Sequence, residues 1–295
     1  MSIFSGLEEL VERDYPLAKT TWYGLGGPAD YFIRPKSVEQ LQEVVRRCNE
    51  NEIRIYVMGH GSNLLISDEG LRGAVIKLDS GQFGRTDFDA DGTGLRAWAG
   101  AELRKVVLSC VEKGLSGLEP LTDIPGSVGG AVKMNAGGHF GDFGSVVESV
   151  GLMDRAGNVF ETSKPELVFD YRGSNITAEF ILSARLELTP GDPEQIMRTV
   201  KEIWIYKNNS QPLNKRNAGC IFKNPRGMSA GALIDRAGLK GLEVGGAVVS
   251  EKHANFFIAR PGCKSRDVMR LIEIVRERVA RQFNIELELE IEMWK

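Results

Sequence analysis

The chain has 295 residues, of which 42% are hydrophobic and 26% are charged, and its formal net charge is −3. These values are typical of globular proteins, and the lack of a basic excess argues against a nucleic-acid partner. No apolar run approaches the roughly 18 residues that a membrane span needs, and the acidic N-terminus lacks the layout of a signal peptide. We therefore expect a cytoplasmic protein, and the scattered cysteines and histidines predict no metal site.

The first predicted unit, residues 1–79, is a small α/β unit. Ser37 with Gln40 three residues later is a capping-box signal, and apolar residues follow at helical spacing as far as position 48. A strand over 53–57 runs into a glycine loop, and a second strand covers 74–78. The loop lacks the third glycine of a dinucleotide-binding fingerprint, so we reject that interpretation. Its amides, hydroxyl and carboxamide suit an anion, and a plain β-turn is the alternative.

The second predicted unit covers residues 80–203. It begins with a strand over 95–99 and a helix over 101–113, which Gly114 ends. A hairpin is predicted over 146–161, followed by a strand over 180–188. A further helix starts at Pro193, with Asp192 as its N-cap.

The third predicted unit covers residues 204–284, and a last strand follows it. We predict helices over 230–237 and 265–283, with a strand region over 245–258 between them. Apolar residues and glutamates alternate strictly over 285–291, which predicts a strand with a solvated face of glutamates. We expect the segment 285–295 to return to the second unit.

A glycine-rich stretch, Gly114 to Gly144, carries the strongest local signal. Its glycines fall in pairs with apolar residues between them, which argues against a flexible tether. Pro125 and the residues Gly126-Ser127-Val128-Gly129-Gly130 offer several backbone amides and a hydroxyl in a tight turn, which suits phosphate oxygens. Packed turns in a β-rich domain are the alternative that the glycines alone leave open.

Several long segments together resemble one family. In chain order they are TTWYGLGGPADYFIRP, GHGSNLLISDEG, GLSGLEPLTDIPGSVGGAVKMNAGG, YRGS, QPLNKRNAGCIFKNP and GLKGLEVGGAVVSEKHANF. They resemble the UDP-N-acetylenolpyruvoylglucosamine reductase (MurB) family of bacterial cell-wall synthesis, in its compact type II branch, and the resemblance covers nearly the whole chain.

The resemblance implies an α/β (α+β) fold of three domains. A two-subdomain FAD-binding unit of the vanillyl-alcohol-oxidase/PCMH type would comprise 1–79 and 80–203, and 204–284 would bind the substrate. The implied reaction is NADPH-dependent, FAD-mediated reduction of UDP-N-acetylglucosamine enolpyruvate to UDP-N-acetylmuramate. The implied partners are these small molecules, with no obligate protein partner, no nucleic acid and no membrane.

The resemblance also implies three catalytic residues. Arg172 of YRGS matches the family's arginine, whose guanidinium can hold a carboxylate through two parallel hydrogen bonds. Glu290 matches the glutamate of the family's C-terminal LExE pattern and would act protonated, so we expect partial burial to raise its pKa. Cys220 stands where most of the family has a serine as proton donor, and a thiol can also donate a proton. A small buried cysteine without chemistry is the alternative for Cys220.

The remaining implied site residues bind ligands. We assign FAD, held non-covalently, to the two glycine loops: Gly59, Gly61, Ser62, Asn63, Leu64, Pro125, Gly126, Ser127, Gly129, Gly130, Asn135, Ala136 and Gly137. The candidates for the nucleotide sugar are Lys223, Asn224, Lys252 and His253. A purely structural role is equally open for His253.

Two other functions remain possible from the sequence. A different FAD-dependent oxidoreductase on the same fold would keep the two glycine loops, but it should not need AGCIFKNP together with KHANF. A non-enzymatic phosphate- or nucleotide-binding module would leave the Arg172, Cys220 and Glu290 set unexplained.

Overall fold

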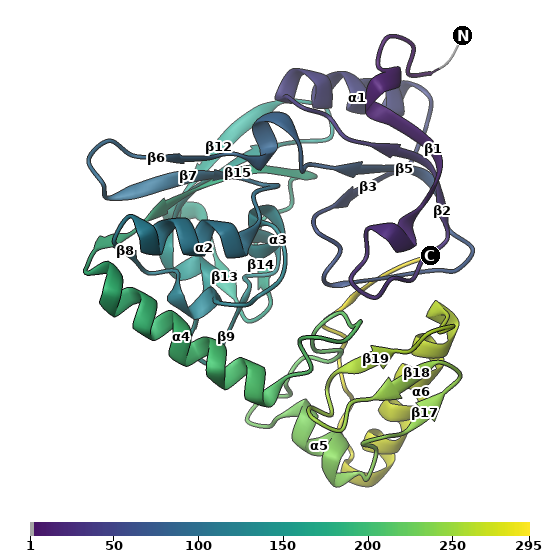
Figure 1. Ribbon diagram of the computed structural model, residues 1–295. Helices are drawn as coiled ribbons and strands as arrows, with labels where there is room; N and C mark the ends of the chain where they lie inside the picture. The colour runs from purple at the N-terminus through teal and green to yellow at the C-terminus, as the bar shows by residue number, and fades with distance from the viewer. Residues whose placement is uncertain (1–2) are drawn as a thin grey trace. The chain divides into compact units, whose positions relative to one another are not determined.

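The computed structural model describes residues 3–295 and divides the chain into two compact units (Figure 1). The first unit consists of Met1–Arg13, Tyr31–His60 and Gly73–Tyr206, and the second of Asp14–Asp30, Gly61–Arg72 and Lys207–Lys295. Each unit has its own cluster of buried apolar side chains. Each therefore has the separate core expected of a folding unit.

Two sheets organise the first part of the chain. A five-stranded antiparallel sheet has the strand order β12-β11-β15-β7-β6, and helices α2 and α3 lie on one face of it (Figure 1). A four-stranded sheet has the order β1-β2-β5-β3, in which β3 and β5 run parallel. The strands of the two sheets are β1 (Val11–Pro16), β2 (Pro28–Ile33), β3 (Ile55–Met58), β5 (Leu71–Lys77), β6 (Thr86–Phe88), β7 (Gly94–Trp98), β11 (Val147–Met153), β12 (Val159–Ser163) and β15 (Phe180–Glu187).

Helices and short strand pairs complete the first unit. The strand pairs are β10 with β9, β13 with β14, and β16 with β8, and each is two residues long. Their bounds are β8 (Leu115–Ser116), β9 (Gly137–Gly138), β10 (Gly141–Asp142), β13 (Phe169–Asp170), β14 (Gly173–Ser174) and β16 (Thr189–Pro190). The helices are α1 (Val38–Glu50), α2 (Leu103–Glu112), α3 (Val128–Lys133) and α4 (Pro193–Ser210), whose last residues enter the second unit.

The second unit packs two helices against a small antiparallel sheet. The sheet has the order β17 (Glu243–Val244), β18 (Ala247–Val249) and β19 (Phe257–Ala259), and it contacts α6 (Ser265–Phe283). Helix α5 (Ala230–Arg236) contacts α6 as well. A separate parallel pair joins β4 (Leu64–Ile66) to β20 (Glu292–Trp294), so residues from both ends of the chain meet in this unit.

Most predicted elements are present at or near their predicted bounds. Helix α1 is capped as predicted, because the Ser37 side chain accepts from the Gln40 N–H. The predicted helix over 265–283 is α6, and Asn284 ends it with a φ of +56°. The predicted hairpin is the β11–β12 pair, and the Asp192 side chain accepts from the Glu194 N–H at the start of α4. Local propensity and capping therefore determine where these elements begin and end.

The predicted strand over 285–291 is wrong. That segment makes only an isolated bridge, Phe222 with Leu289, and the strand begins at Glu292. The end of the chain pairs with β4 in the second unit, whereas we expected it to return to residues 80–203. The alternating burial is nevertheless real, because Leu287 and Ile291 are buried in the core of the second unit. Side chains alternate between two faces wherever the backbone is extended, even without a continuous ladder of strand hydrogen bonds.

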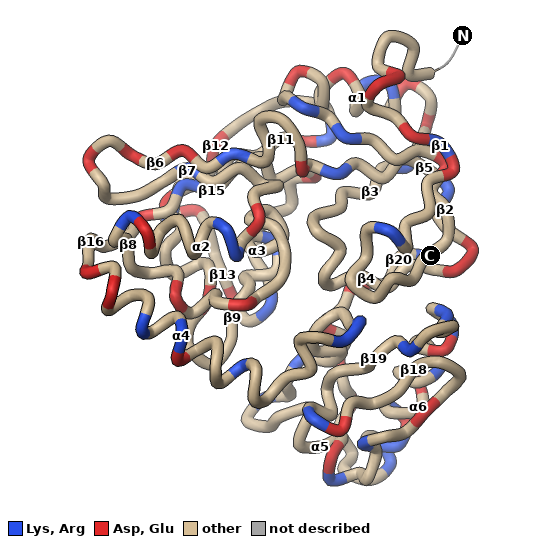
Figure 2. Tube along the Cα trace, in the orientation of Figure 1, with Lys and Arg blue, Asp and Glu red and all other residues tan. Residues whose placement is uncertain are grey.

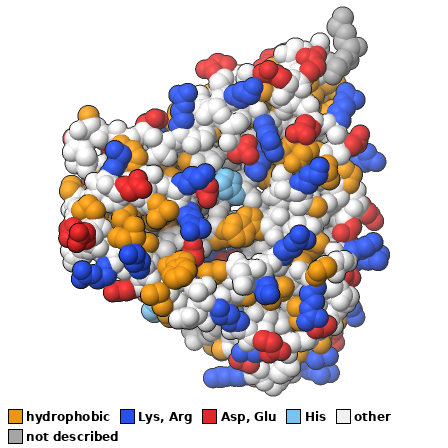
Figure 3. Space-filling view, in the orientation of Figure 1, with side chains coloured by type: hydrophobic (Ala, Val, Ile, Leu, Met, Phe, Trp, Pro, Cys, Tyr) orange, Lys and Arg blue, Asp and Glu red, His pale blue; other side chains and the backbone are white. Residues whose placement is uncertain are grey.

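Charged residues of both signs are interspersed along both units (Figures 2 and 3). No described helix has the length and apolar character needed to cross a membrane.

Candidate active site

The Cys220 segment and the Glu290 segment run side by side in the second unit. The Glu290 N–H donates to the Ile221 carbonyl at 2.8 Å, and the Lys223 N–H donates to the Glu288 carbonyl at 2.8 Å. On its other side, Cys220 forms an isolated bridge with Phe256. The structure thus brings the backbones of the predicted thiol donor and the predicted carboxyl donor together.

Glu290 differs from its three alternating neighbours in burial. It is half-buried, whereas Glu286, Glu288 and Glu292 are all exposed. Glu288 lies two residues earlier on the same face and is the nearest alternative to Glu290 as the acid. Its side chain is 73% exposed and forms an ion pair with Lys223. The burial pattern therefore favours the glutamate that the family motif indicated.

Asn63 connects the glycine loop of the second unit to the Glu290 segment. Its side-chain Nδ2 donates to the Glu290 carbonyl at 3.0 Å, and its own carbonyl accepts from the Glu292 N–H at 2.9 Å. Gly61, two residues earlier, has a φ of +68°, and a Cβ there would lie 2.3 Å from the Thr20 carbonyl oxygen. Ser62 is half-buried and Leu64, which starts β4, is buried.

Arg172 lies in the tight turn between β13 and β14 of the first unit. Its φ is +58°, a region that residues other than glycine rarely adopt, and such strain clusters at functional sites. Its guanidinium carbon lies 5.1 Å from the ring centroid of Tyr171. Asn135 holds this turn from the glycine-rich stretch, because its Nδ2 donates to the Asp170 carbonyl at 3.1 Å.

The glycine loops of the first unit have the bare backbone that a bound pyrophosphate needs. A Cβ at Gly59 would lie 2.6 Å from Ser127 Oγ, so the loop after β3 and the turn before α3 are in contact. Ser127 caps α3 by accepting from the Gly130 N–H, and Gly130 is exposed. Gly126 has a φ of +143°, which a side chain would not tolerate. These features fit FAD.

The other predicted FAD residues lie along the same stretch. Pro125, Ala136 and Gly137 are half-buried, and the Gly129 N–H donates to the Ala99 carbonyl at 2.8 Å. Asn135 is 4% exposed, and its Oδ1 accepts from the Gly144 N–H. Both ends of that amide therefore bind protein backbone.

The four substrate candidates lie in the second unit. Lys223 pairs with Glu288, and the side-chain oxygen of the exposed Asn224 accepts from the Ala230 N–H at 2.9 Å. Lys252 donates to the Asn208 carbonyl. His253 is half-buried, and its Nδ1 accepts from the Asn255 N–H at 3.3 Å. Of these four, His253 has the contacts most typical of a structural residue.

Comparisons with known proteins identify the family of the chain. Residues 211–294 match the C-terminal domain of UDP-N-acetylenolpyruvoylglucosamine reductase, and residues 29–163 match an FAD binding domain. The curated reductase of Carboxydothermus hydrogenoformans is 41% identical over an alignment that covers 97% of this chain and 97% of the reductase. The chain belongs to the UDP-N-acetylenolpyruvoylglucosamine reductase family.

Solved structures support the family and the fold. The crystal structure of the reductase (MurB) from Thermus caldophilus matches with a TM-score of 0.84 at 38% identity, covering 97% of this chain and 99% of that one. A Phl p 4 glucose dehydrogenase matches 65% of this chain and 45% of its own with a TM-score of 0.51, and at 19% identity it shows the fold alone. The predicted family, the fold class and FAD as cofactor are confirmed.

Sequence reasoning missed Asn255, although it lies in the KHANF motif. Asn255 is 2% exposed and accounts for three hydrogen bonds to the Cys220 segment. Its backbone carbonyl accepts from the Ile221 N–H, its Oδ1 accepts from the Phe222 N–H at 3.0 Å, and its Nδ2 donates to the Phe222 carbonyl at 2.7 Å. Its place inside the KHANF motif was the only signal in the sequence that pointed to it.

The environments of the titratable groups separate Cys220 from the other cysteines. Burial raises the pKa of Cys48 to about 11 and that of Cys110 to about 12. Burial, with Asp267 nearby, raises the pKa of Cys263 to about 11. Cys220 alone among the four is half-buried rather than buried. It is therefore the most accessible thiol of this family member.

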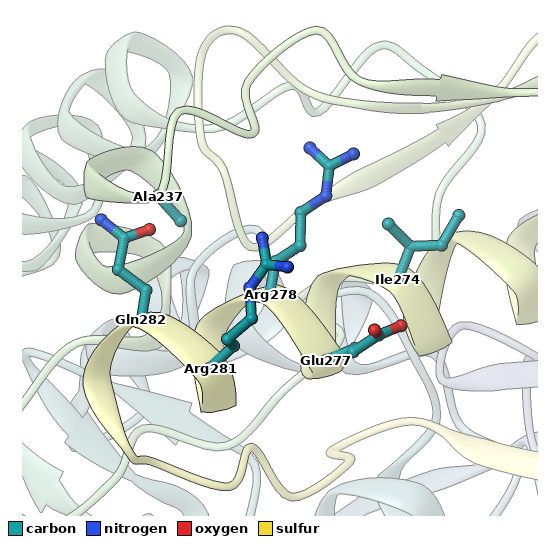
Figure 4. A pocket seen from close by; sticks show the side chains of 6 residues that line it. All are labelled: Ala237, Ile274, Glu277, Arg278, Arg281 and Gln282. Atoms are coloured by element: carbon teal, nitrogen blue, oxygen red, sulfur yellow. The ribbon is translucent and has the colours of Figure 1, made fainter.

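One cavity lies apart from the candidate site. It has a volume of about 660 Å³ and is lined by Ala237, at the end of α5, and by five residues of α6 (Figure 4). Its charged lining groups are Glu277, Arg278 and Arg281. It contains none of the predicted site residues, and we assign it no role in the reaction.

Proposed function

We propose that this chain catalyses the NADPH-dependent, FAD-mediated reduction of UDP-N-acetylglucosamine enolpyruvate to UDP-N-acetylmuramate in peptidoglycan synthesis. The observation that carries the proposal is the hydrogen-bonded pairing of the Cys220 and Glu290 segments, in a chain that matches reductases over 97% of its length. In this proposal, residues 1–79 and 80–203 bind FAD and 204–284 bind the substrate. The enzyme acts as a single chain on small molecules, in the cytoplasm.

The reaction adds a hydride and a proton across one carbon–carbon double bond. FAD bound at the glycine loops would supply a hydride, obtained from NADPH, to the CH₂ carbon of the enolpyruvyl group. That carbon becomes a methyl group, and the electron pair of the double bond moves toward the adjacent carbon and its carboxylate. The substrate then carries extra negative charge until a proton reaches the adjacent carbon, so the protein must stabilise that charge.

Three side chains have the chemistry that this step requires. The guanidinium of Arg172 stays charged at all working pH values and can bind the substrate carboxylate through two parallel hydrogen bonds. The half-buried Glu290, in its protonated form, would donate a hydrogen bond to the developing charge. The Cys220 thiol gives its proton to the carbon next to the carboxylate, and it regains a proton from water in the next cycle.

The ligand assignments separate the residues for FAD from those for the nucleotide sugar. The FAD phosphates would lie against the two glycine loops, which contain Gly59, Gly61, Gly126 and Gly130. Lys223 and Asn224 bind the nucleotide sugar, and Lys252 and His253 are weaker candidates for the same ligand.

A two-step spectral experiment tests the function. The purified protein is expected to be yellow. It should lose its flavin absorbance when NADPH is added without oxygen, and recover that absorbance when UDP-N-acetylglucosamine enolpyruvate is added. Recovery with other enol or enone acceptors, but not with this substrate, would identify a different FAD-dependent oxidoreductase on the same fold. A protein that retains no flavin would contradict the proposal altogether.

Single-variant kinetics then test the proton donor. Cys220→Ala is expected to slow reoxidation of the reduced flavin by the substrate while leaving reduction by NADPH unchanged. Cys220→Ser is expected to keep appreciable turnover, because a hydroxyl can replace the thiol as donor. Reoxidation at the wild-type rate in Cys220→Ala would remove Cys220 from the mechanism.

A further inference from the structure

Glu290 sits in a segment that has little regular hydrogen bonding of its own. Backbone bonds of this segment join Lys223 N–H to the Glu288 carbonyl, Glu290 N–H to the Ile221 carbonyl and Glu292 N–H to the Asn63 carbonyl. Regular strand pairing starts only at Glu292, which pairs with Leu64. The backbone bonds that hold the Glu290 segment therefore come from two neighbouring segments, those of Cys220 and of Asn63.

Asn63 supplies the side-chain contact to the Glu290 backbone. Its Nδ2 donates to the Glu290 carbonyl at 3.0 Å, and its own carbonyl accepts from the Glu292 N–H at 2.9 Å. The two bonds fix the backbone on either side of Ile291, which is buried in the core of the second unit. Because all of these residues belong to the second unit, the arrangement is a property of that unit alone.

We propose that Asn63 is a positioning residue for Glu290, and that its side-chain amide is not a ligand of the FAD pyrophosphate. The inference rests on the proposed function, and it changes the role that the glycine-loop motif suggested for Asn63. The loop can still present the backbone of Gly61 and Ser62 to the cofactor, whereas the amide group of Asn63 faces the carboxyl-terminal segment. A donor to the carbonyl of Glu290 sets where its carboxyl group lies, and small displacements of a reacting group have large effects on rate.

The test compares Asn63→Ala and Asn63→Asp with the wild-type holoenzyme. Asn63→Asp keeps the shape of the side chain but removes the Nδ2 donor, so it also serves if the alanine variant fails to fold. Both variants are expected to retain FAD with an affinity within about threefold of wild type and to be reduced by NADPH at an unchanged rate. Reoxidation by the enolpyruvyl substrate is expected to slow by about tenfold or more.

A double-mutant cycle shows whether Asn63 acts through Glu290. In a Glu290→Gln background, Asn63→Ala is expected to slow reoxidation by less than about twofold, because the group that Asn63 positions has already lost its acid function. The pH profile of reoxidation should also shift in Asn63→Ala and not in the control. The control is Asn51→Ala, which removes a similar bond, from Asn51 Nδ2 to the Arg47 carbonyl at 2.9 Å, on the first unit.

Three results would overturn the inference. The first is loss of FAD affinity in Asn63→Ala, and the second is equal slowing of flavin reduction and flavin reoxidation. The third is a double variant whose reoxidation is slowed by the product of the two single-variant factors. FAD affinity is measured by flavin titration of the apoprotein without either substrate, so it tests Asn63 even if the proposed substrate is wrong. Failure of the substrate to reoxidise the wild-type enzyme would instead count against the proposed function.

Discussion

The Asn255 side chain allows a stability prediction whose size follows from the structure. Replacing Asn255 with leucine, whose side chain branches at the same atom but has no polar group, removes the partners of both the Phe222 N–H and the Phe222 carbonyl. Phe222 is fully buried, so water does not easily replace the lost bonds. An unsatisfied buried polar group costs about 1–3 kcal/mol. Because two such groups lose their partners, we expect Asn255→Leu to reduce the free energy of unfolding by about 2–6 kcal/mol.

Urea unfolding, followed by circular dichroism and by tryptophan fluorescence, measures this change. The matched control is Asn158→Leu, which removes an exposed amide that donates to Asp154 at 2.9 Å, and its effect should stay within about 0.5 kcal/mol. If Asn255→Leu folds, its flavin reoxidation should be slower than wild type, because Cys220 lies two residues before Phe222. An Asn255→Leu variant as stable as wild type would refute the reasoning, since the Phe222 backbone would then have other partners.

Three further predictions concern single groups. Arg172→Gly should abolish turnover while changing the free energy of unfolding by less than about 1 kcal/mol. The stability change is small because relief of the strain at positive φ offsets the greater freedom of glycine in the unfolded chain. Substantial activity in this variant would exclude Arg172 from the reaction. A maleimide should label Cys220 before the three buried cysteines, and mass spectrometry of Cys220→Ser should lack the fast-labelled peptide. Burial, aided by Lys77, lowers the pKa of His60 below its ordinary value of about 6.5. The neutral ring therefore contributes stability above pH 6.5 that is lost as the pH falls below it, and urea unfolding should show a smaller acid-side loss in His60→Gln.

Local chemistry made much of the fold predictable. Helix α6 was predicted with both of its observed ends from apolar residues that repeat at helical spacing, and in the structure Asn284 adopts the left-handed conformation that ends it. The β11–β12 hairpin was predicted for a similar reason, because Asp154 accepts from the N–H groups of Ala156 and Asn158 in its turn. In both elements the deciding interactions join residues close in sequence.

The site was less predictable because its deciding contacts join residues far apart in sequence. Four alternating glutamates are equivalent in the sequence, and only the fold leaves Glu290 half-buried. The bond from Asn63 to Glu290 spans 227 positions, and the bonds from Asn255 to Phe222 span 33. Family resemblance named Glu290 and Cys220, but no periodicity or capping rule could indicate which asparagine holds each of them.

The three proposed catalytic residues share one structural circumstance. Each lies in backbone with too little strand pairing to fix it: Arg172 in a two-residue turn, Cys220 at an isolated bridge, and Glu290 before the last strand. In each case a buried or half-buried asparagine bonds to the backbone at or within two residues of the catalytic position, namely Asn135, Asn255 and Asn63. An amide suits this task because it both donates and accepts, so it can pair backbone groups without adding a net charge beside the acid and the guanidinium.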